Sequence, residues 1–183
     1  MSTGGFTDCL RQRGAASVIA YDVGYGQVHD KLRRDAAVAV HERTNVRDLT
    51  PDDVPPPRPD LLVADLSFIA LRTVLGTLRA LITAEGEAVA LVKPQFEARR
   101  EEVGKGGVVR DARVWRRVLE EVAAAAHEVG WVGFDATASP LLGPAGNVEF
   151  LVHLHPEPAT STDQVRARTA AAVTEGEGHR SRR

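Results

Sequence analysis

Several features that mark particular classes of protein are scarce in this sequence of 183 residues. A single cysteine, Cys9, excludes an internal disulfide, and no apolar run is long enough to cross a bilayer. The sequence also does not open with the charged and apolar regions of a secretory signal. We therefore expect a cytoplasmic protein without a membrane span.

Positive charge is not in excess either. The formal net charge is −2, so no overall basic field indicates a nucleic-acid partner. Lysine is rare among the 23 basic residues and occurs only at Lys31, Lys93 and Lys105. Because arginine does not give up its proton in proteins, each lysine is a candidate for a role that arginine cannot fill.

Hydrophobic residues make up 43% of the chain, which is enough for the core of one domain. Short β-branched runs alternate with amphipathic stretches, a pattern typical of an α/β fold with a mostly parallel sheet. A turn-rich segment alone separates the last two runs, which predicts that they pair antiparallel. The expected strands are 17–23, 38–42, 61–66, 88–92, 131–137 and 148–154, and the expected helices are 6–13, 27–34, 70–81 and 113–129.

Two further segments indicate how the chain is divided. The proline cluster PDDVPPPRPD at 51–60 predicts a stiff connection that leads into the run LLVAD. Residues 157–183 contain almost no large apolar side chain, so they cannot bury enough surface to offset their ordering entropy. We expect one domain over 1–156 and a disordered tail over 157–183.

A glycine pair at the start of the chain is a candidate ligand loop. Gly4 and Gly5 lie among hydroxyl groups at a helix start, where the backbone can approach a ligand closely. Asp22 closes the next apolar strand, about where nucleoside-binding α/β folds place the acid that holds ribose hydroxyls. The alternative is a flexible terminus beside an ordinary strand end.

Three polar residues follow or interrupt buried runs further along. Asp65 ends LLVAD and Lys93 ends AVALV, so both lie at the carboxyl edge where open α/β sheets bind ligands. Glu149 lies between Val148 and Phe150, which predicts a carboxylate set into an apolar strand. Each of the three is also compatible with a purely structural ion pair.

Other motifs indicate less. The run Gly104–Gly107 lacks the spacing of a phosphate loop, and the basic residues around it form either a solvated loop or a phosphate-contacting surface. The histidines show no metal-ligand spacing on a common face, so we expect no metal site; those considered are His29, His41, His127, His153 and His155.

The sequence resembles the TlyA family of hemolysin-named proteins and ribosomal RNA 2′-O-methyltransferases, which belong with the FtsJ-like enzymes. The resemblance is carried by the runs STGGFTDCL, VIAYDVGYGQ, ERTNVR, VADLSFI, LVKPQFEARREEVGKGGVVRD and GPAGNVEFL. The resemblance covers residues 2 to about 155. It implies a Rossmann-like fold, the cofactor S-adenosylmethionine, and methylation of cytidine ribose in ribosomal RNA or ribosomal subunits.

The resemblance also implies roles for residues. Asp65, Lys93 and Glu149 match three members of the family's Lys-Asp-Lys-Glu catalytic tetrad, and Asp65 also borders the cofactor. The remaining cofactor-binding residues would be Ser2, Thr3, Gly4, Gly5, Phe6, Asp22, Thr44 and Asn45.

Family members carry an S4-type RNA-binding domain, a first tetrad lysine and a first sheet strand ahead of this region. None of these precedes Met1, so we expect an N-terminally incomplete domain whose unpaired strand edges favour self-association. The alternative function is an inactive fragment that binds RNA or cofactor. A nicotinamide-dependent oxidoreductase is a distant third because the glycine pattern differs, and no amphipathic membrane segment supports hemolysis.

Overall fold

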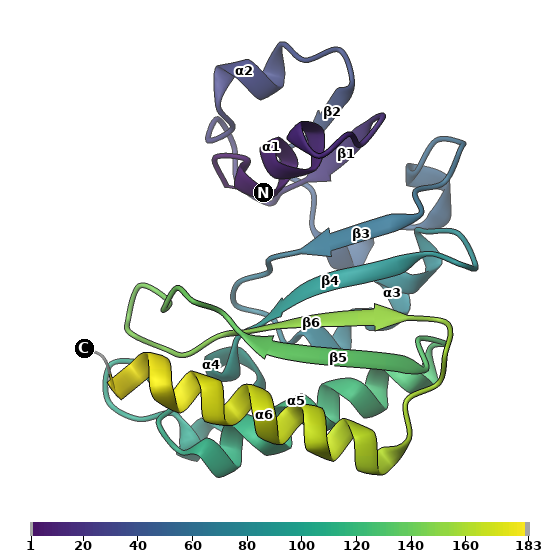
Figure 1. Cartoon of the computed structure of the whole chain (residues 1–183). Helices are drawn as coiled ribbons and strands as arrows, with labels where there is room; N and C mark the ends of the chain where they lie inside the picture. Colours follow the sequence, from purple (N-terminus) through teal and green to yellow (C-terminus); the bar gives the residue numbers. More distant parts are fainter. Residues whose placement is uncertain (1, 182–183) are drawn as a thin grey trace. The chain divides into compact units, whose positions relative to one another are not determined.

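The chain divides at its proline cluster. The structure, a computed structural model, describes residues 2–181 and separates into a first unit, Met1–Arg58, and a second unit, Pro59–Arg183 (Figure 1). Within residues 2–181, the strands on each side of the cluster pair only among themselves, which accounts for the division. The single domain expected over 1–156 stays a prediction.

The first unit contains a two-stranded parallel sheet. Strand β1 pairs with β2 from Val18 opposite Val38 to Tyr21 opposite His41. The helices and strands of this unit are α1 (Gly5–Gln12), β1 (Val18–Tyr21), α2 (Asp30–Arg33), β2 (Val38–His41), η1 (Val46–Asp48) and η2 (Pro51–Asp53).

The second unit contains a four-stranded sheet in the order β3-β4-β6-β5 (Figure 1). Strands β3 and β4 are parallel, and β6 runs antiparallel to both of its neighbours, which confirms the predicted final pair. The elements are β3 (Leu61–Ala64), η3 (Leu71–Thr73), α3 (Leu75–Ala80), β4 (Glu87–Val92), α4 (Pro94–Glu97), η4 (Arg100–Glu102), α5 (Ala112–Glu128), β5 (Gly133–Ala138), β6 (Phe150–His155) and α6 (Thr162–Ser181).

The core of the second unit lies between its sheet and its long helices. Val92 and Phe150 are a register pair of β4 and β6, and both are fully buried. Trp115 of α5 packs its ring against the edge of Phe150, with ring centroids 5.9 Å apart. Because alternate residues of β4 are buried up to Val92, the end of the strand at Lys93 is fixed by the core.

Four of the described strands are edge strands, namely β1 and β2 of the first sheet and β3 and β5 of the second. Strand β1 pairs only with β2, and β3 pairs only with β4, within residues 2–181. Both strands therefore have one row of backbone groups without a strand partner, as expected from the sequence. Self-association through these edges stays a prediction.

The expectation of a disordered tail over 157–183 is wrong for its described part, because α6 spans Thr162–Ser181. The helix runs along β5 and against α5 (Figure 1). Its contact face is made of small residues, which allow close approach without long apolar side chains; the buried ones are Thr169, Ala172, Val173 and Gly176. Residues 182–183 of the expected tail lie outside the described residues.

A search of the described helices found none with the length and apolar character needed to cross a membrane.

Two glycines of α6 provide a matched test of its packing. A Cβ on Gly176 would lie 2.8 Å from the Cγ1 of Val148, whereas a Cβ on Gly178 would meet no atom within 4 Å. We expect Gly178→Ala to stabilise the protein by about 1 kcal/mol through helix propensity. Gly176→Ala should instead destabilise it, because overpacking costs about 1–3 kcal/mol. Urea unfolding curves measure both effects, and equal stabilisation by the two substitutions would contradict the packing of α6.

Candidate active site

In the first unit, the start of α1 and the end of β1 are joined through Asp22. Its Oδ2 accepts a hydrogen bond from the backbone N–H of Ser2 at 2.7 Å, and its Oδ1 accepts one from the N–H of Gly24 at 2.7 Å. Partial burial alone would raise the pKa of this carboxyl, but hydrogen-bond donors, including these two, bring the pKa below its ordinary value. Asp22 is thus held as a carboxylate at the end of β1.

The glycine loop has the backbone geometry that a ligand loop needs. Gly4 has a φ of 104°, a conformation that residues with a side chain rarely adopt, and it is the residue before α1. A Cβ at Gly5 would meet no atom within 4 Å, so the backbone is open on that side. Phe6 is 41% exposed at the start of α1. The loop is anchored at Thr3, whose carbonyl accepts the backbone N–H of His29 at 3.1 Å.

Thr44 and Asn45 lie next to Asp22 through the backbone. The N–H of Thr44 donates to the carbonyl of Asp22 at 2.9 Å. The side chain of Asn45 accepts the N–H of Arg47 at 3.0 Å and so caps the short helix η1. The first unit therefore brings most of the cofactor residues expected from the sequence to one region around the ends of β1 and β2.

In the second unit, Asp65 and Lys93 form an ion pair. Both residues directly follow their strands, β3 and β4, which are parallel neighbours. The Nζ of Lys93 lies 2.5 Å from Oδ1 of Asp65, and it donates to the Oγ of Ser67 at 3.1 Å. The Lys93 side chain is only 12% exposed, whereas that of Asp65 is 45% exposed. Lys93 is therefore the more sheltered member of the pair.

Glu149 lies beside this pair on the sheet. It directly precedes Phe150, which is opposite Val92, the residue before Lys93. Glu149 is buried, and its Oε1 accepts a hydrogen bond from the side-chain amide of Gln95 at 2.9 Å. A Cβ on Gly143 would come within 2.7 Å of the same oxygen, so glycine at this position leaves space for the carboxylate. The structure thus places all three expected catalytic residues at one end of the sheet.

Sequence reasoning missed the residues that hold this end together. Gln95 and Glu97 lie in α4, immediately after Lys93. Glu97 is buried, accepts the backbone N–H of Leu71, and has the guanidinium of Arg72 3.6 Å from its Oε2. It therefore ties the segment after β4 to the segment after β3. No sequence pattern indicates this contact, because Glu97 accepts its hydrogen bond from a backbone N–H group, which almost every residue carries.

An exposed aromatic residue also lies near the pair. Phe68 is 90% exposed, has a φ of 62°, and follows Ser67, the hydrogen-bond partner of Lys93. Its ring contacts the ring of Phe96 with centroids 5.1 Å apart. A non-glycine residue with positive φ and an exposed ring costs folding free energy, which is typical of functional sites.

The candidate phosphate loop at Gly104–Gly107 forms a tight turn, closed by the bridge between Gly104 and Val108. The side chain of Asn147 fixes this turn, since its Oδ1 accepts the N–H of Val109 at 3.0 Å and its amide donates to Gly107 at 2.9 Å. The turn presents Lys105 to solvent.

Comparison with known families matches residues 1–155 to FtsJ-like methyltransferases. The chain belongs to this family. It is 51% identical over 163 residues to the 16S/23S rRNA (cytidine-2′-O)-methyltransferase TlyA of Mycobacterium tuberculosis strain H37Rv. That match covers 89% of this chain and 59% of the relative, so the chain spans about three fifths of the curated protein's length.

Two solved structures extend the comparison. A protein from Streptococcus thermophilus, named as a candidate hemolysin, is 38% identical with a TM-score of 0.89, covering 99% of this chain and 65% of the other. An S-adenosylmethionine-dependent methyltransferase from Mesorhizobium loti is 14% identical with a TM-score of 0.53, covering 84% of this chain and 87% of the other. The second match shows a shared fold. Membership of the FtsJ-like family and the α/β methyltransferase fold therefore confirm the resemblance found in the sequence.

The buried Glu97 predicts a specific pH dependence of stability. Burial raises the pKa of Glu97 above its ordinary value of 4.5, although the N–H of Leu71 and the charge of Arg72 act in the opposite direction. The folded protein then binds more protons than the unfolded chain between these two pKa values, so the free energy of unfolding falls as pH rises through that interval. Glu97→Gln should remove this fall in urea unfolding measured from pH 4 to pH 8.

The exposed Glu101 supplies the control, because Glu101→Gln should leave the pH profile of stability unchanged. A profile for Glu97→Gln that still follows the wild type would show that Glu97 is not the group responsible.

Proposed function

We propose that this protein is an S-adenosylmethionine-dependent 2′-O-methyltransferase that acts on cytidine ribose in ribosomal RNA. The observation that carries the proposal is the Lys93–Asp65 ion pair, with 2.5 Å between Nζ and Oδ1, at the carboxyl ends of neighbouring strands in an FtsJ-like chain. The cytidine-2′-O-methyltransferase name of the Mycobacterium tuberculosis relative supports the choice of nucleoside and of ribosomal RNA. A ribosomal substrate places the proposed activity in the cytoplasm.

The first unit supplies the residues that fit the cofactor. Asp22 is held as a carboxylate at the end of β1, and a carboxylate is the acceptor that two neighbouring ribose hydroxyls require. The open backbone at Gly5 lets the N-terminus of α1 approach the charged part of a ligand. When bound, S-adenosylmethionine supplies a methyl group activated by a sulfonium. The loop Ser2–Phe6, Asp22, Thr44 and Asn45 would bind and orient it.

The second unit supplies the groups for the proton and the nucleophile. A ribose hydroxyl is a weak nucleophile at neutral pH, so it needs a base and in-line placement. We assign the proton to Lys93, whose Nζ can accept it once the lysine is neutral, and the orientation of that Nζ to Asp65 and Ser67. Glu149, held by Gln95, adds a fixed negative charge at the same end of the sheet.

Exposed cations after α4 fit a polyanionic substrate. The segment between Lys93 and Arg117 is basic, and most of its arginines and its second lysine are exposed. Phosphate contacts position an RNA without selecting its sequence. The exposed cations are Arg99, Arg100, Lys105, Arg110, Arg113 and Arg116. Phe68, with its exposed ring next to Ser67, is placed to stack on an unpaired base.

The cofactor assignment predicts the effect of removing Asp22. Asp22→Ala should weaken binding of S-adenosylmethionine by about 10- to 150-fold, equivalent to the 1.5–3 kcal/mol of a hydrogen bond to a charged group. Titration calorimetry on the chain measures the affinity. Asp30→Ala removes an exposed carboxylate of α2 that pairs with Arg34, and it should leave the affinity unchanged. Equal affinities for wild type and Asp22→Ala would remove Asp22 from the site.

The catalytic assignment predicts the effect of exchanging lysine for arginine. Transfer of labelled methyl groups to ribosomal subunits should fall by about 100-fold or more in Lys93→Arg, the usual contribution of a positioned base. The matched control is Lys105→Arg, which keeps an exposed cation and should retain transfer. Affinity for S-adenosylmethionine should be the same in all three proteins, because Lys93 acts on the proton.

Nuclease digestion of the product should recover the label on the 2′-oxygen of cytidine. Label on a base, or full transfer by Lys93→Arg, would contradict the proposed function.

A further inference from the structure

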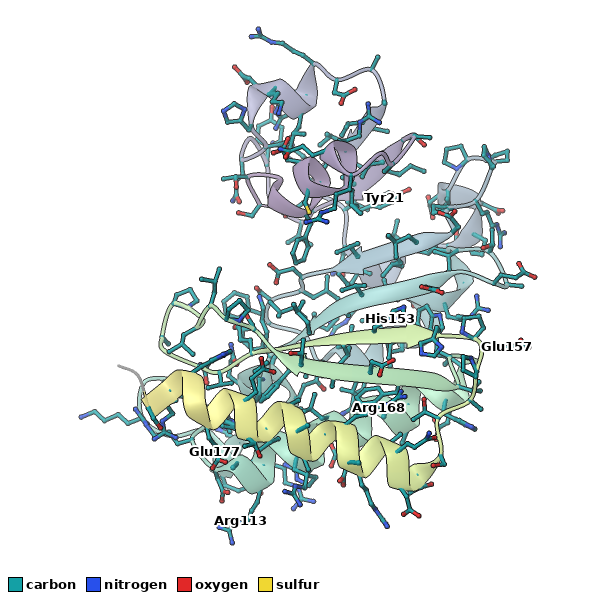
Figure 2. All side chains as sticks on the ribbon, viewed as in Figure 1. Tyr21, Arg113, His153, Glu157, Arg168 and Glu177 are labelled. Atoms are coloured by element: carbon teal, nitrogen blue, oxygen red, sulfur yellow. The ribbon has the colours of Figure 1, made fainter. Side chains whose placement is uncertain are left out.

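A second cluster of titratable side chains lies far from Lys93 on the same sheet. His153 and His155 alternate along β6 and share one face of the strand. Asp135 of β5 is directly opposite His153 in the antiparallel register. Strand β4 begins near this cluster at Glu87 and ends at Val92, and six residues of strand span about 20 Å. The cluster is therefore separate from the proposed catalytic end. Figure 2 labels His153 on β6, which ends shortly before Glu157.

The three side chains converge on one volume. One ligand atom from each of Asp135, His153 and His155 lies within 4.8 Å of the other two. The Nε2 of His155 is 3.4 Å from Oδ2 of Asp135. Ligand atoms that bind a tetrahedral Zn²⁺ at about 2.0–2.1 Å are about 3.3 Å apart, so this pair already has the separation that the ion requires.

The imidazole of His155 is held in the orientation that a metal needs. It is nearly buried, and its Nδ1 lies 2.9 Å from the backbone carbonyl of Glu157. That carbonyl can only accept, so Nδ1 carries a proton, and Nε2 is the ring nitrogen that faces Asp135. A Cβ on Gly133, the residue opposite His155, would lie 2.0 Å from the ring, so only glycine leaves room for this orientation.

Two charged neighbours complete the surroundings. Glu87 is 2.8 Å from the Nε2 of His153 and orients that ring. Arg168 of α6 lies 2.9 Å from Oδ1 of Asp135 and also donates to the carbonyl of Phe134 at 2.5 Å. It therefore holds one carboxylate oxygen and leaves the other facing His155. The carboxylates of Asp135 and Glu87 carry two negative charges, whereas the guanidinium of Arg168 carries one positive charge. The remaining negative charge favours a divalent cation.

We propose that Asp135, His153 and His155 form a binding site for a divalent transition metal, with Zn²⁺ as the ion that a set of two imidazoles and carboxylate oxygen favours. This proposal departs from the sequence-based expectation of no metal site. The histidine pair was visible in the sequence, but its third ligand comes from another strand and appears only with the register of β5 and β6. Because the ion would join β5 to β6 beside α6, its role is to stabilise this edge of the sheet.

Titration calorimetry of the untagged chain with zinc chloride tests the site. We expect one Zn²⁺ per chain and a melting temperature that rises with zinc concentration, because an ion that binds only the folded state stabilises it. His153→Asn and His155→Asn should each weaken zinc binding about 10-fold or more and abolish the rise in melting temperature. Since His153 is 41% exposed, its variant decides the question even if His155→Asn fails to fold.

Two controls separate this site from other zinc ligands. His127→Asn changes an exposed histidine of α5, and Cys9→Ser removes the single exposed thiol. Both should bind zinc as the wild type does. Absence of stoichiometric binding, equal binding by His153→Asn, or loss of binding in Cys9→Ser would each overturn the proposal. None of these readouts depends on methyl transfer, so they do not test the proposed catalytic function.

Discussion

The contact between Lys93 and Asp65 is the interaction on which this account depends. An ion pair in contact with water contributes only about 0–1 kcal/mol to stability, and Asp65 is 45% exposed. The pair is therefore not explained by folding energetics. Its position is explained by the sheet, because two parallel strands end next to each other and each is followed at once by one of these residues.

The surrounding structure restricts where the lysine amine can lie. Ser67 accepts a hydrogen bond from it, and Glu97 ties the segments that follow β3 and β4 to each other. Glu149 enters the same end of the sheet because β6 runs antiparallel to β4, with Phe150 opposite Val92. Burial of these strand ends keeps the charged groups at fixed separations, which is the condition under which they can orient a proton transfer.

Much of this arrangement could be predicted from the sequence. Nearly continuous apolar runs before Asp65 and Lys93 made both strands recognisable, and parallel pairing then placed their ends together. Their burial on both faces is not confirmed, because β3 is buried only at Ala64 and β4 only at alternate residues. The helix α5 was predicted within about one residue at each end, because its apolar periodicity is long and Gly130 follows it. The turn-rich link correctly predicted the antiparallel pair of β5 and β6.

Other features depend on contacts that no local pattern encodes. The helix α6 packs through small residues such as Ala172 and Gly176, which composition alone assigns to disorder. Glu97 acts through the backbone of Leu71, and the division of the chain after Arg58 follows from which strands pair. The cluster around His155 needs the register of two strands and the glycine at 133. In each case the decisive partner is distant in sequence.

The most direct test of the central claim places a chemically restored amine at position 93. In a Cys9→Ser background, the cysteine introduced by Lys93→Cys is the only thiol, so alkylation with bromoethylamine rebuilds an amine of nearly the same length there and nowhere else. The account predicts that the cysteine variant does not methylate ribosomal RNA and that alkylation restores the activity. Methyl transfer by the unalkylated variant, or none after complete alkylation, would contradict it.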